Sequence, residues 1–301
     1  MKIIPVLIAG CHGELGSALV RRVSGKYNVI GLGRDEEKLI SNVDYEYVKL
    51  DVLQRRDLKD VFKTYRPRFI INAIAMIDVD NCEKEKEKCW KTNVESVQNI
   101  IYACKSIEAN FIHISTDYIF NGKNGPYHEE DRPDPINYYG KSKLASENLV
   151  ISSGLKYSII RTSMLYSFNY VKKKQNFIIK MWEQLSNGNK MKVIMDEVRT
   201  PTLTENLADS IWKMINLERN GIFHIAGKDI IDRYAYALEF ANYFGFDKNL
   251  IETVKAEDLE NRVPRPKNCG LLVEKAEKEL YLNLIGIKKG FELFKEQMKV
   301  S

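Results

Sequence analysis

Cysteine is scarce in this 301-residue chain, and its spacing argues against two kinds of site. The five cysteines are odd in number and include no Cys-x-x-Cys pair: Cys11, Cys82, Cys89, Cys104 and Cys269. A disulfide framework would use an even number, and a structural zinc site would use paired ligands. We therefore expect reduced thiols in a cytoplasmic protein. No clustered ligand pattern predicts a metal site.

Long apolar runs and concentrated charge are also missing. No stretch approaches the roughly 18 apolar residues that a membrane-spanning helix needs. The N-terminal "MKIIPVLIAG" is too short an apolar run for a signal peptide. The formal net charge is +5, with acidic and basic residues interleaved in most segments. We therefore expect no membrane and no nucleic-acid partner, while a small anionic ligand is compatible with the charge.

Short runs rich in Ile and Val alternate with helical patterns over the first two thirds of the chain. Continuous apolar runs of this kind are typical of strands buried on both faces of a parallel sheet. The pattern predicts an α/β protein with a Rossmann-type, doubly wound parallel sheet. Residues 82–107 predict a helix with Trp90, Val94, Val97, Ile101 and Cys104 on one face. The predicted strands are "IIPVLIAG", "YNVIGLG", "RFIINAIA", "NFIHIST" and "KYSIIRTS".

The alternation of predicted strands and helices ends at about residue 166. Residues 169–176 read "NYVKKKQN", a basic polar loop, and the helical pattern around 176–187 has no strand immediately before it. The run "GIFHIAG" at 221–227 predicts one more strand of the sheet. We predict a NAD(P)-binding Rossmann domain of residues 1–165 plus about 201–230. A smaller, mainly helical substrate-binding lobe would comprise about 166–200 plus 231–301.

A glycine loop, "GCHGELG", follows the first predicted strand and opens a helix. Glycines let the backbone approach a pyrophosphate, and the N-terminus of the helix supplies N–H donors and partial positive charge. In this position the loop predicts dinucleotide binding. His12 reads as a tolerated loop residue. The predicted cofactor-binding residues of the loop are Gly10, Gly13, Glu14, Leu15 and Gly16.

The end of the second predicted strand bears on the choice of dinucleotide. An acid there would bond the ribose hydroxyls, whereas an arginine accommodates a 2′-phosphate. Arg34 and Asp35 are neighbours at this point, and Arg34 comes first after the glycine, which favours NADPH, with NADH as the alternative. Further along, Asp51 and Val52 would lie beside the adenine. The small residues of "NAIA" would run under the cofactor, which adds Asn72, Ala73 and Ala75 to the predicted cofactor site.

Tyr139 and Lys143 are four residues apart and share one helix face, behind the predicted N-cap Asn137. A free tyrosine has a pKa near 10, and a nearby ammonium group would lower it toward neutrality. Tyr138 has Ser142 at the same spacing and lacks such a neighbour, and Lys141 should face solvent. Thr116 falls at the end of a predicted parallel strand, the edge at which ligands bind. The predicted catalytic residues are therefore Thr116, Tyr139 and Lys143.

Several motifs together resemble the dTDP-4-dehydrorhamnose reductase family, within the extended short-chain dehydrogenases/reductases. They are the Gly10/Gly13/Gly16 loop, "ISTDYIF", "YYGKSKLASE", "RTSMLY", "TPT" at 200–202 and "RPKN" at 265–268. The resemblance implies that NAD(P)H reduces the C4 ketone of a nucleotide-linked deoxyhexose, as in dTDP-L-rhamnose biosynthesis, with Tyr139 as proton donor. Arg265 would then reach the nucleotide diphosphate. Asp117, Tyr118 and Met164 would contact the substrate; 4,6-dehydratases typically carry an acid where Tyr118 stands.

Departures from the family pattern lie in the loops expected to form the sugar pocket. Met164 replaces a tryptophan of "RTSWVY", and Glu197 and Arg199 replace Gln and Gly of "DQxGxPT". These changes keep two alternatives open. One is a regulatory, NADP-binding subunit like the β subunit of methionine adenosyltransferase, and the other is a nucleotide-sugar epimerase of the same superfamily. The predicted small-molecule partner is a nucleotide sugar. A homodimer is compatible with the sequence, which does not specify the oligomeric state.

Overall fold

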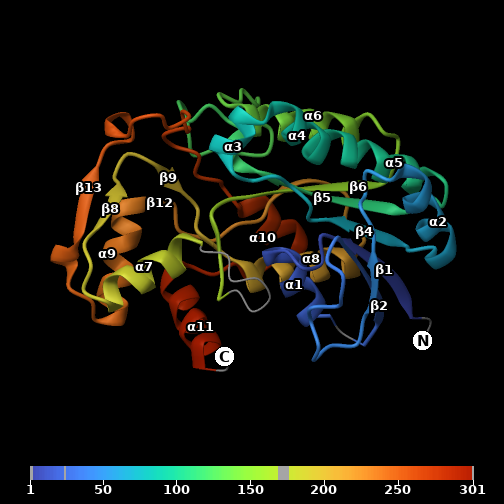
Figure 1. Ribbon diagram of the computed structural model, residues 1–301, viewed down its shortest axis with the longest axis horizontal. Coiled ribbons are helices and arrows are strands. Elements are labelled where there is room, and N and C mark those ends of the chain that lie inside the picture. The colour runs from blue at the N-terminus through green and yellow to red at the C-terminus, as the bar shows by residue number, and fades with distance from the viewer. Residues whose placement is uncertain (1–2, 24, 169–175, 300–301) are drawn as a thin grey trace.

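A seven-stranded parallel sheet forms the centre of the molecule (Figure 1). The computed structural model describes residues 3–23, 25–168 and 176–299, so all of the basic loop predicted at 169–176 except its last residue lies outside the described residues. The strand order is β11-β6-β5-β4-β1-β2-β3, which confirms the doubly wound, Rossmann-type α/β fold. The strands are β1 Ile4–Ala9, β2 Tyr27–Gly33, β3 Glu46–Lys49, β4 Phe69–Asn72, β5 Asn110–Thr116, β6 Tyr157–Thr162 and β11 Gly221–His224.

The five apolar runs of the first two thirds are β1, β2, β4, β5 and β6, as predicted. The run at 221–227 is also confirmed as a strand, because β11 pairs in parallel with β6. The edge strand β3 has no counterpart among the predictions. Its four residues, Glu46–Lys49, have a charged side chain at each end and are exposed or only partly buried, so they lack the apolar run that marks the inner strands.

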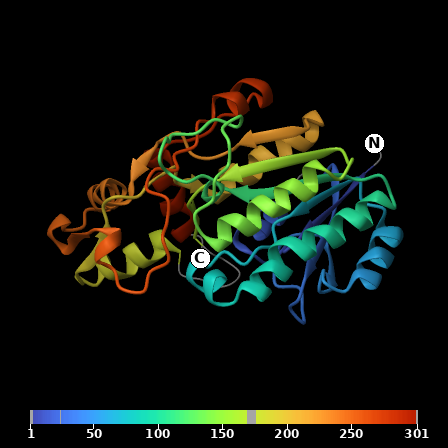
Figure 2. The same cartoon turned by 90° about the horizontal axis from the view of Figure 1, so that it is seen from above.

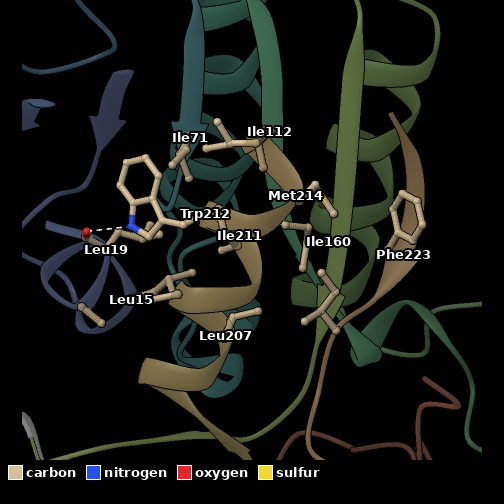
Figure 3. Close-up of a cluster of buried hydrophobic side chains, with 14 of the residues drawn as sticks. Leu15, Leu19, Ile71, Ile112, Ile160, Leu207, Ile211, Trp212, Met214 and Phe223 are labelled. Atoms are coloured by element: carbon tan, nitrogen blue, oxygen red, sulfur yellow. Dashed lines mark hydrogen bonds between the residues drawn. The ribbon is translucent and has the colours of Figure 1, made fainter. Parts of the chain in front are cut away.

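Helices cover both faces of the sheet (Figures 1 and 2). One face packs against α1 Glu14–Arg21, α8 Thr204–Leu217 and α10 Glu274–Leu280. The other packs against α2 Arg55–Tyr65, α5 Ser96–Lys105 and α6 Tyr138–Ile151. Figure 3 shows the first interface, where the Trp212 indole of α8 donates its Nε1–H to the Leu19 carbonyl of α1 at 3.1 Å. Across the described residues, every helix is too short or too polar to cross a membrane.

The helix predicted over 82–107 is broken into four pieces. They are α3 Val79–Lys84, α4 Lys86–Trp90, the π-helical turn Lys91–Glu95 and α5. A π-helical turn takes more residues than an α-helical one and shifts the faces on either side of it. Val94, Val97, Ile101 and Cys104 are buried as predicted, but Trp90 is 39% exposed. Trp90 therefore does not share the buried face of the other four residues, and this part of the prediction is wrong.

A second hydrophobic cluster builds the smaller lobe, seen on the left of Figure 1. Its helices are α7 Phe177–Ser186, α9 Arg233–Phe244 and α11 Ile287–Lys299. Short strands that the sequence analysis missed lie beside them, in the pairs β8 Met191–Ile194 with β13 Ile251–Val254, β9 Val198–Arg199 with β12 Ile231–Asp232 and β7 Leu165–Tyr166 with β10 Thr202–Leu203. Single turns of 3₁₀ helix occur at Asp117–Ile119, Lys248–Leu250 and Ala256–Asp258.

The predicted boundary at residue 231 does not coincide with the packing. Cys269, Leu271, Ala276 and Leu280 are buried in the same cluster as the central sheet, and α10 lies against the sheet helices. Amphipathic periodicity shows that a helix has one buried face, but it does not say which of two cores that face joins. The division of the chain into domains therefore stays a prediction, with 269–284 on the side of the sheet.

An ion pair links α3 to the segment before α10. The Arg265 guanidinium donates from Nη1 to Asp80 Oδ1 at 2.7 Å and from Nη2 to Oδ2 at 2.6 Å. The Val263 N–H also donates to Asp80 Oδ1 at 3.0 Å. The hydrogen bonds with Arg265 are the main reason that the pKa of Asp80 falls from 3.8 to about 2. The pair thus holds the chain of the smaller lobe against the helices of the sheet.

Ile211→Ala should lower the free energy of unfolding by about 2–5 kcal/mol, because it leaves a cavity between α8 and the sheet. Ile211 is fully buried, whereas Ile151 at the end of α6 is 44% exposed and serves as the control. Ile151→Ala should cost less than about 1 kcal/mol. Denaturant unfolding of both variants measures the difference, and equal losses would contradict the packing described for α8.

Asp80→Asn should weaken the acid dependence of stability. In the wild-type protein Asp80 stays ionised when folded down to a pKa of about 2, while the unfolded carboxyl takes up its proton near 3.8. The stability that this carboxylate contributes is therefore present above about pH 4 and is lost as the pH falls toward 2. Unfolding free energies measured at pH 5, 4 and 3 should fall less steeply in the variant. Parallel slopes would mean that the pair does not persist in solution.

Candidate active site

The glycine loop is wound too tightly for side chains at two of its three glycines. Gly10 has a φ of +85°, in the left-handed region, and a Cβ there would lie 3.2 Å from the Ala73 backbone. A Cβ at Gly16 would lie 2.1 Å from the Gly10 carbonyl oxygen. The Gly13 N–H closes the turn on that same oxygen at 2.9 Å, and α1 starts at the next residue. The backbone N–H groups at the start of α1 thus follow directly on this tight turn, in the arrangement that binds phosphate.

The side chains of Glu14 and Leu15 do not face this turn. Glu14 Oε1 accepts hydrogen bonds from Thr204 Oγ1 at 3.0 Å, Ser167 Oγ at 3.2 Å and Asn176 Nδ2 at 3.3 Å, so it ties α1 to the smaller lobe. Leu15 is buried in the layer between α1 and α8 (Figure 3). Only the backbone of these two residues is left for the predicted cofactor contact. The spacing of the glycines in the sequence does not show whether Glu14 and Leu15 would contact a cofactor through their backbone or through their side chains.

The two residues after β2 are in different environments. Arg34 is exposed, whereas the Asp35 carboxylate accepts a hydrogen bond from the His12 ring, Nδ1 to Oδ2, at 2.8 Å. At the end of β3, Asp51 Oδ1 accepts the Leu53 N–H at 3.0 Å, and Val52 is 4% exposed in the core below α2 and α5. Arg34 therefore has the most exposed position of the residues predicted near the adenosine.

Asn72 is fully buried and supports the site from beneath. Its Oδ1 accepts the Ile74 N–H at 3.1 Å, which turns its Nδ2 toward His113 Nδ1 at 3.3 Å. An amide N–H can only donate, so Nδ1 is the acceptor and the ring proton of neutral His113 is on Nε2. Burial lowers the pKa of His113 far below its usual value, and Lys143 adds to the effect. The contact of Asn72 with a cofactor stays a prediction, while Ala73 and Ala75 are partly exposed.

The tertiary structure brings the three predicted catalytic residues together. Thr116 is the last residue of β5, and Tyr139 and Lys143 lie one turn apart at the start of α6. The Asn137 side chain caps this helix, accepting the Gly140 N–H at 2.9 Å, as predicted. Because Gly140 has no side chain, α6 can lie against the strand end; a Cβ there would be 2.2 Å from the Tyr118 carbonyl oxygen. Lys141 on the same helix is exposed.

The side-chain amine of Lys143 is held by two residues of β5. Nζ donates to the Ile114 carbonyl at 2.8 Å and lies 3.2 Å from His113 Nε2, and the side chain is 1% exposed. Burial is the main reason that the pKa of Lys143 falls to about 8, with Glu147 and Cys89 opposing the shift. At neutral pH the amine is still mainly protonated. It therefore keeps its positive charge, one turn of α6 away from Tyr139.

The pKa of Tyr139 moves in the opposite direction to the prediction. Burial of the phenol raises it, and a hydrogen bond with the Thr116 side chain opposes the rise. The prediction weighed the attraction of the lysine for a phenolate and neglected the cost of taking that phenolate out of water. The phenol is consequently protonated at neutral pH. In that state it can give a proton to a bound oxygen.

Asp117 is committed to hydrogen bonds within the protein. It is 2% exposed, and its Oδ1 and Oδ2 accept from Thr116 Oγ1 at 3.0 Å and Ser163 Oγ at 2.8 Å. Burial raises its pKa, while Arg199 at 3.5 Å lowers it. The neighbouring Tyr118 ring stands edge-on to Tyr139 with 5.6 Å between centroids. Of these two neighbouring residues, Tyr118 is therefore the one whose ring packs against Tyr139.

A group of arginines surrounds Glu197, which is 1% exposed. Arg262 Nη2 lies 2.6 Å from Glu197 Oε1, and Arg233 Nη1 lies 3.3 Å from Oε2. The Arg199 guanidinium lies between Glu197 and Asp117 and 5.2 Å from the centre of the Tyr118 ring. Arg233 and Arg262 escaped the sequence analysis. They come from segments far apart in the chain, and no local pattern marks them.

Met164 and Arg265 complete the set of predicted residues. Met164 has a φ of +42°, is partly buried and packs against the cluster of the smaller lobe. Arg265 is engaged by Asp80, as described above. No group of three or more His, Cys, Asp or Glu side chains is positioned to hold a metal ion within 3–23, 25–168 and 176–299. The site thus consists of a glycine loop, a Thr/Tyr/Lys group and an arginine group.

Comparison with known proteins gives relatives along almost the whole chain. The spore coat polysaccharide biosynthesis protein SpsK of Bacillus subtilis is 31% identical and covers 87% of this chain and 86% of its own. The β subunit of rat methionine adenosyltransferase 2 is 26% identical over 90% of this chain and 81% of its own.

Solved structures also match almost the whole chain. A structure described as a hypothetical dTDP-4-dehydrorhamnose reductase from Sulfolobus tokodaii is 34% identical, with a TM-score of 0.83 over 95% of this chain and 99% of that one. The dTDP-4-dehydrorhamnose reductase of Bacillus anthracis in complex with NADP is 27% identical, with a TM-score of 0.87 over 99% and 100%. Residues 2–299 match the family described as RmlD substrate binding domain, and the chain belongs to that family.

Proposed function

We propose that this chain is a reductase that uses NADPH to convert the C4 ketone of a nucleotide-linked 4-dehydro-6-deoxyhexose into an alcohol. The observation that carries the proposal is the meeting of Thr116, Tyr139 and Lys143 at the edge of the sheet where the glycine loop also lies. The Bacillus anthracis relative, a dTDP-4-dehydrorhamnose reductase in complex with NADP, supports the same reaction class. The sugar is a rhamnose precursor in this proposal, and the nucleoside is that of dTDP.

The residues present fit a nicotinamide dinucleotide. The glycines permit the tight turn that leads from β1 into α1, because side chains at Gly10 and Gly16 would collide with the backbone, and the start of α1 supplies N–H donors for a diphosphate. Arg34 would accommodate the 2′-phosphate of NADPH. Bound there, the cofactor supplies a hydride to the ketone carbon. Everything else in the reaction falls to side chains of this chain.

Tyr139 is the proton donor in this proposal. Its raised pKa keeps the phenol protonated until a ketone oxygen becomes an alkoxide beside it. The phenolate left behind would be stabilised by the Thr116 hydroxyl and by the ammonium group of Lys143. Because Lys143 is anchored on the Ile114 carbonyl, its remaining N–H groups can also hold a ribose hydroxyl of the cofactor.

The arginine group supports a substrate with a diphosphate. Arg199, Arg233, Arg262 and Arg265 carry four positive charges, against three negative charges on Asp80, Asp117 and Glu197 when all three acids are ionised. The raised pKa of Asp117 favours its neutral form, which would increase the positive excess. A buried excess of cationic charge is stabilised by an anion, and guanidinium groups suit phosphate oxygens.

Tyr139→Phe should reduce kcat by about 100-fold or more, the typical loss when a general acid is removed. Tyr138→Phe is the matched control, since it removes the neighbouring hydroxyl and should leave the rate nearly unchanged. The assay follows the absorbance of NADPH during incubation with dTDP- and UDP-linked 4-keto-6-deoxyhexoses. Equal activity of the Tyr139→Phe variant and the wild-type protein would refute the assigned role.

Arg34→Ala should weaken NADPH binding by about tenfold relative to NADH, because a charge-assisted hydrogen bond to the 2′-phosphate is lost. Calorimetric titration of each dinucleotide into wild-type and variant protein gives the two ratios. If the ratio stayed constant, the 2′-phosphate would have to be bound elsewhere.

A second candidate function is that of a regulatory subunit that binds a partner enzyme. One relative, the β subunit of methionine adenosyltransferase 2, is named as a subunit of an enzyme. The specific observation in its favour is the Glu197–Arg199 pair, buried where the reductase pattern has Gln and Gly. A protein of this kind would bind NADPH without oxidising it in the presence of any keto-sugar nucleotide. An epimerase, by contrast, would co-purify with NAD(H) and would regenerate it. The keto-sugar screen separates the reductase from both alternatives, and the dinucleotide that co-purifies with the protein separates the epimerase from the regulatory subunit.

A further inference from the structure

His12, in the middle of the glycine loop, is one of the most buried polar residues near the proposed cofactor site. It is 3% exposed. Its ring reaches across to the segment after β2, where Nδ1 lies 2.8 Å from Asp35 Oδ2. Nε2 lies 3.0 Å from the Tyr45 hydroxyl and 3.3 Å from the Leu39 backbone nitrogen. A residue that the sequence marked as tolerated thus joins the loop to the acid beside Arg34.

The direction of these hydrogen bonds follows from the donors. A backbone N–H can only donate, so Leu39 makes Nε2 the acceptor. Burial raises the pKa of Tyr45 to about 12, so its hydroxyl is also protonated beside Nε2. The proton of the neutral imidazole is therefore on Nδ1, from which it is donated to the Asp35 carboxylate.

Asp35 is held from its main chain as well. The Tyr47 hydroxyl donates to the Asp35 carbonyl at 2.6 Å. The Tyr47 ring in turn stacks on the His12 ring, with 4.6 Å between centroids and 23° between planes. The imidazole is thus fixed in plane and in tautomer, and the carboxylate it bonds is fixed with it.

Nearby cationic side chains are engaged in other contacts. Lys49 pairs with Glu36 at 2.6 Å, and Lys38 donates to the Tyr45 carbonyl at 2.9 Å. Arg34 differs, since it is exposed and takes part in no ion pair or hydrogen bond with the residues that the structure describes. Of the charges at the end of β2, the acid is held and the guanidinium is available.

An acid about 20 residues after the glycine loop ordinarily selects NADH, by bonding the ribose hydroxyls and repelling a 2′-phosphate. Asp35 occupies that place, 19 residues after Gly16. We propose that His12 determines cofactor specificity by holding the Asp35 carboxylate on the glycine loop, which leaves Arg34 to bind a 2′-phosphate. The inference rests on the proposed binding of a dinucleotide. It adds His12 as the residue that keeps Asp35 from selecting NADH.

The test is a double-mutant cycle in which the affinity for each dinucleotide is measured. Kd values for NADPH and NADH are measured by calorimetry on wild-type protein, His12→Ala, Asp35→Asn and the double variant, with no substrate present. His12→Ala should lower the ratio of Kd for NADH to Kd for NADPH by about tenfold or more, because the released carboxylate can bond the 2′-hydroxyl and repel the phosphate. Asp35→Asn should change the ratio by less than about threefold alone, but should restore NADPH preference in the His12→Ala background.

His12→Gln controls for the structural effect of losing a buried ring. Its side-chain amide keeps an N–H donor for Asp35, so this variant should keep the NADPH preference even if both His12 variants lose thermal stability. Equal effects of Asp35→Asn with and without His12 would overturn the inference while leaving the reductase proposal intact. Failure of the wild-type protein to bind either dinucleotide would overturn both.

Discussion

The approach of α6 to the end of β5 is the contact on which the proposed chemistry depends. At Gly140 the helix backbone comes so near the Tyr118 carbonyl that no side chain fits. This approach brings Tyr139 to Thr116, and it lets the Lys143 amine reach the Ile114 carbonyl of the same strand. A larger residue at position 140 would push the helix outward and move both side chains together. One missing methyl group therefore controls the geometry of three functional groups.

Burial then determines the protonation state of the Tyr139 and Lys143 side chains. Away from water, the charged form of each is disfavoured, so the pKa of Tyr139 rises and that of Lys143 falls. The neutral imidazole of His113, oriented by Asn72, lies beneath the lysine without adding a charge. The protein thus holds a protonated phenol and an ammonium group on the same helix, and the phenol is in the state from which a proton can be donated. The arginines near Tyr118 extend the same buried, positively charged surroundings toward the smaller lobe.

Much of this arrangement could be predicted from residue order because it is local. The strands β1, β2, β4, β5 and β6 are continuous apolar runs, and the cap at Asn137 is a feature of four adjacent residues. Other features depend on contacts between distant segments. The exposure of Trp90 follows from a π-helical turn, and Arg233 joins Arg262 around Glu197 only after the smaller lobe has folded. No local periodicity contains that information.

The sequence by itself determined the fold class, the glycine loop and the identity of the Thr116, Tyr139 and Lys143 group, because spacing within one strand or helix decides which side chains share an edge or a face. Only the tertiary structure decided what each side chain does there. It assigned Glu14 to the smaller lobe, Leu15 to the core and Asn72 to His113. It also joined His12 to Asp35. The physical reason is that a hydrogen bond or a pKa depends on the neighbours and the water around a group, and folding supplies both from remote parts of the chain.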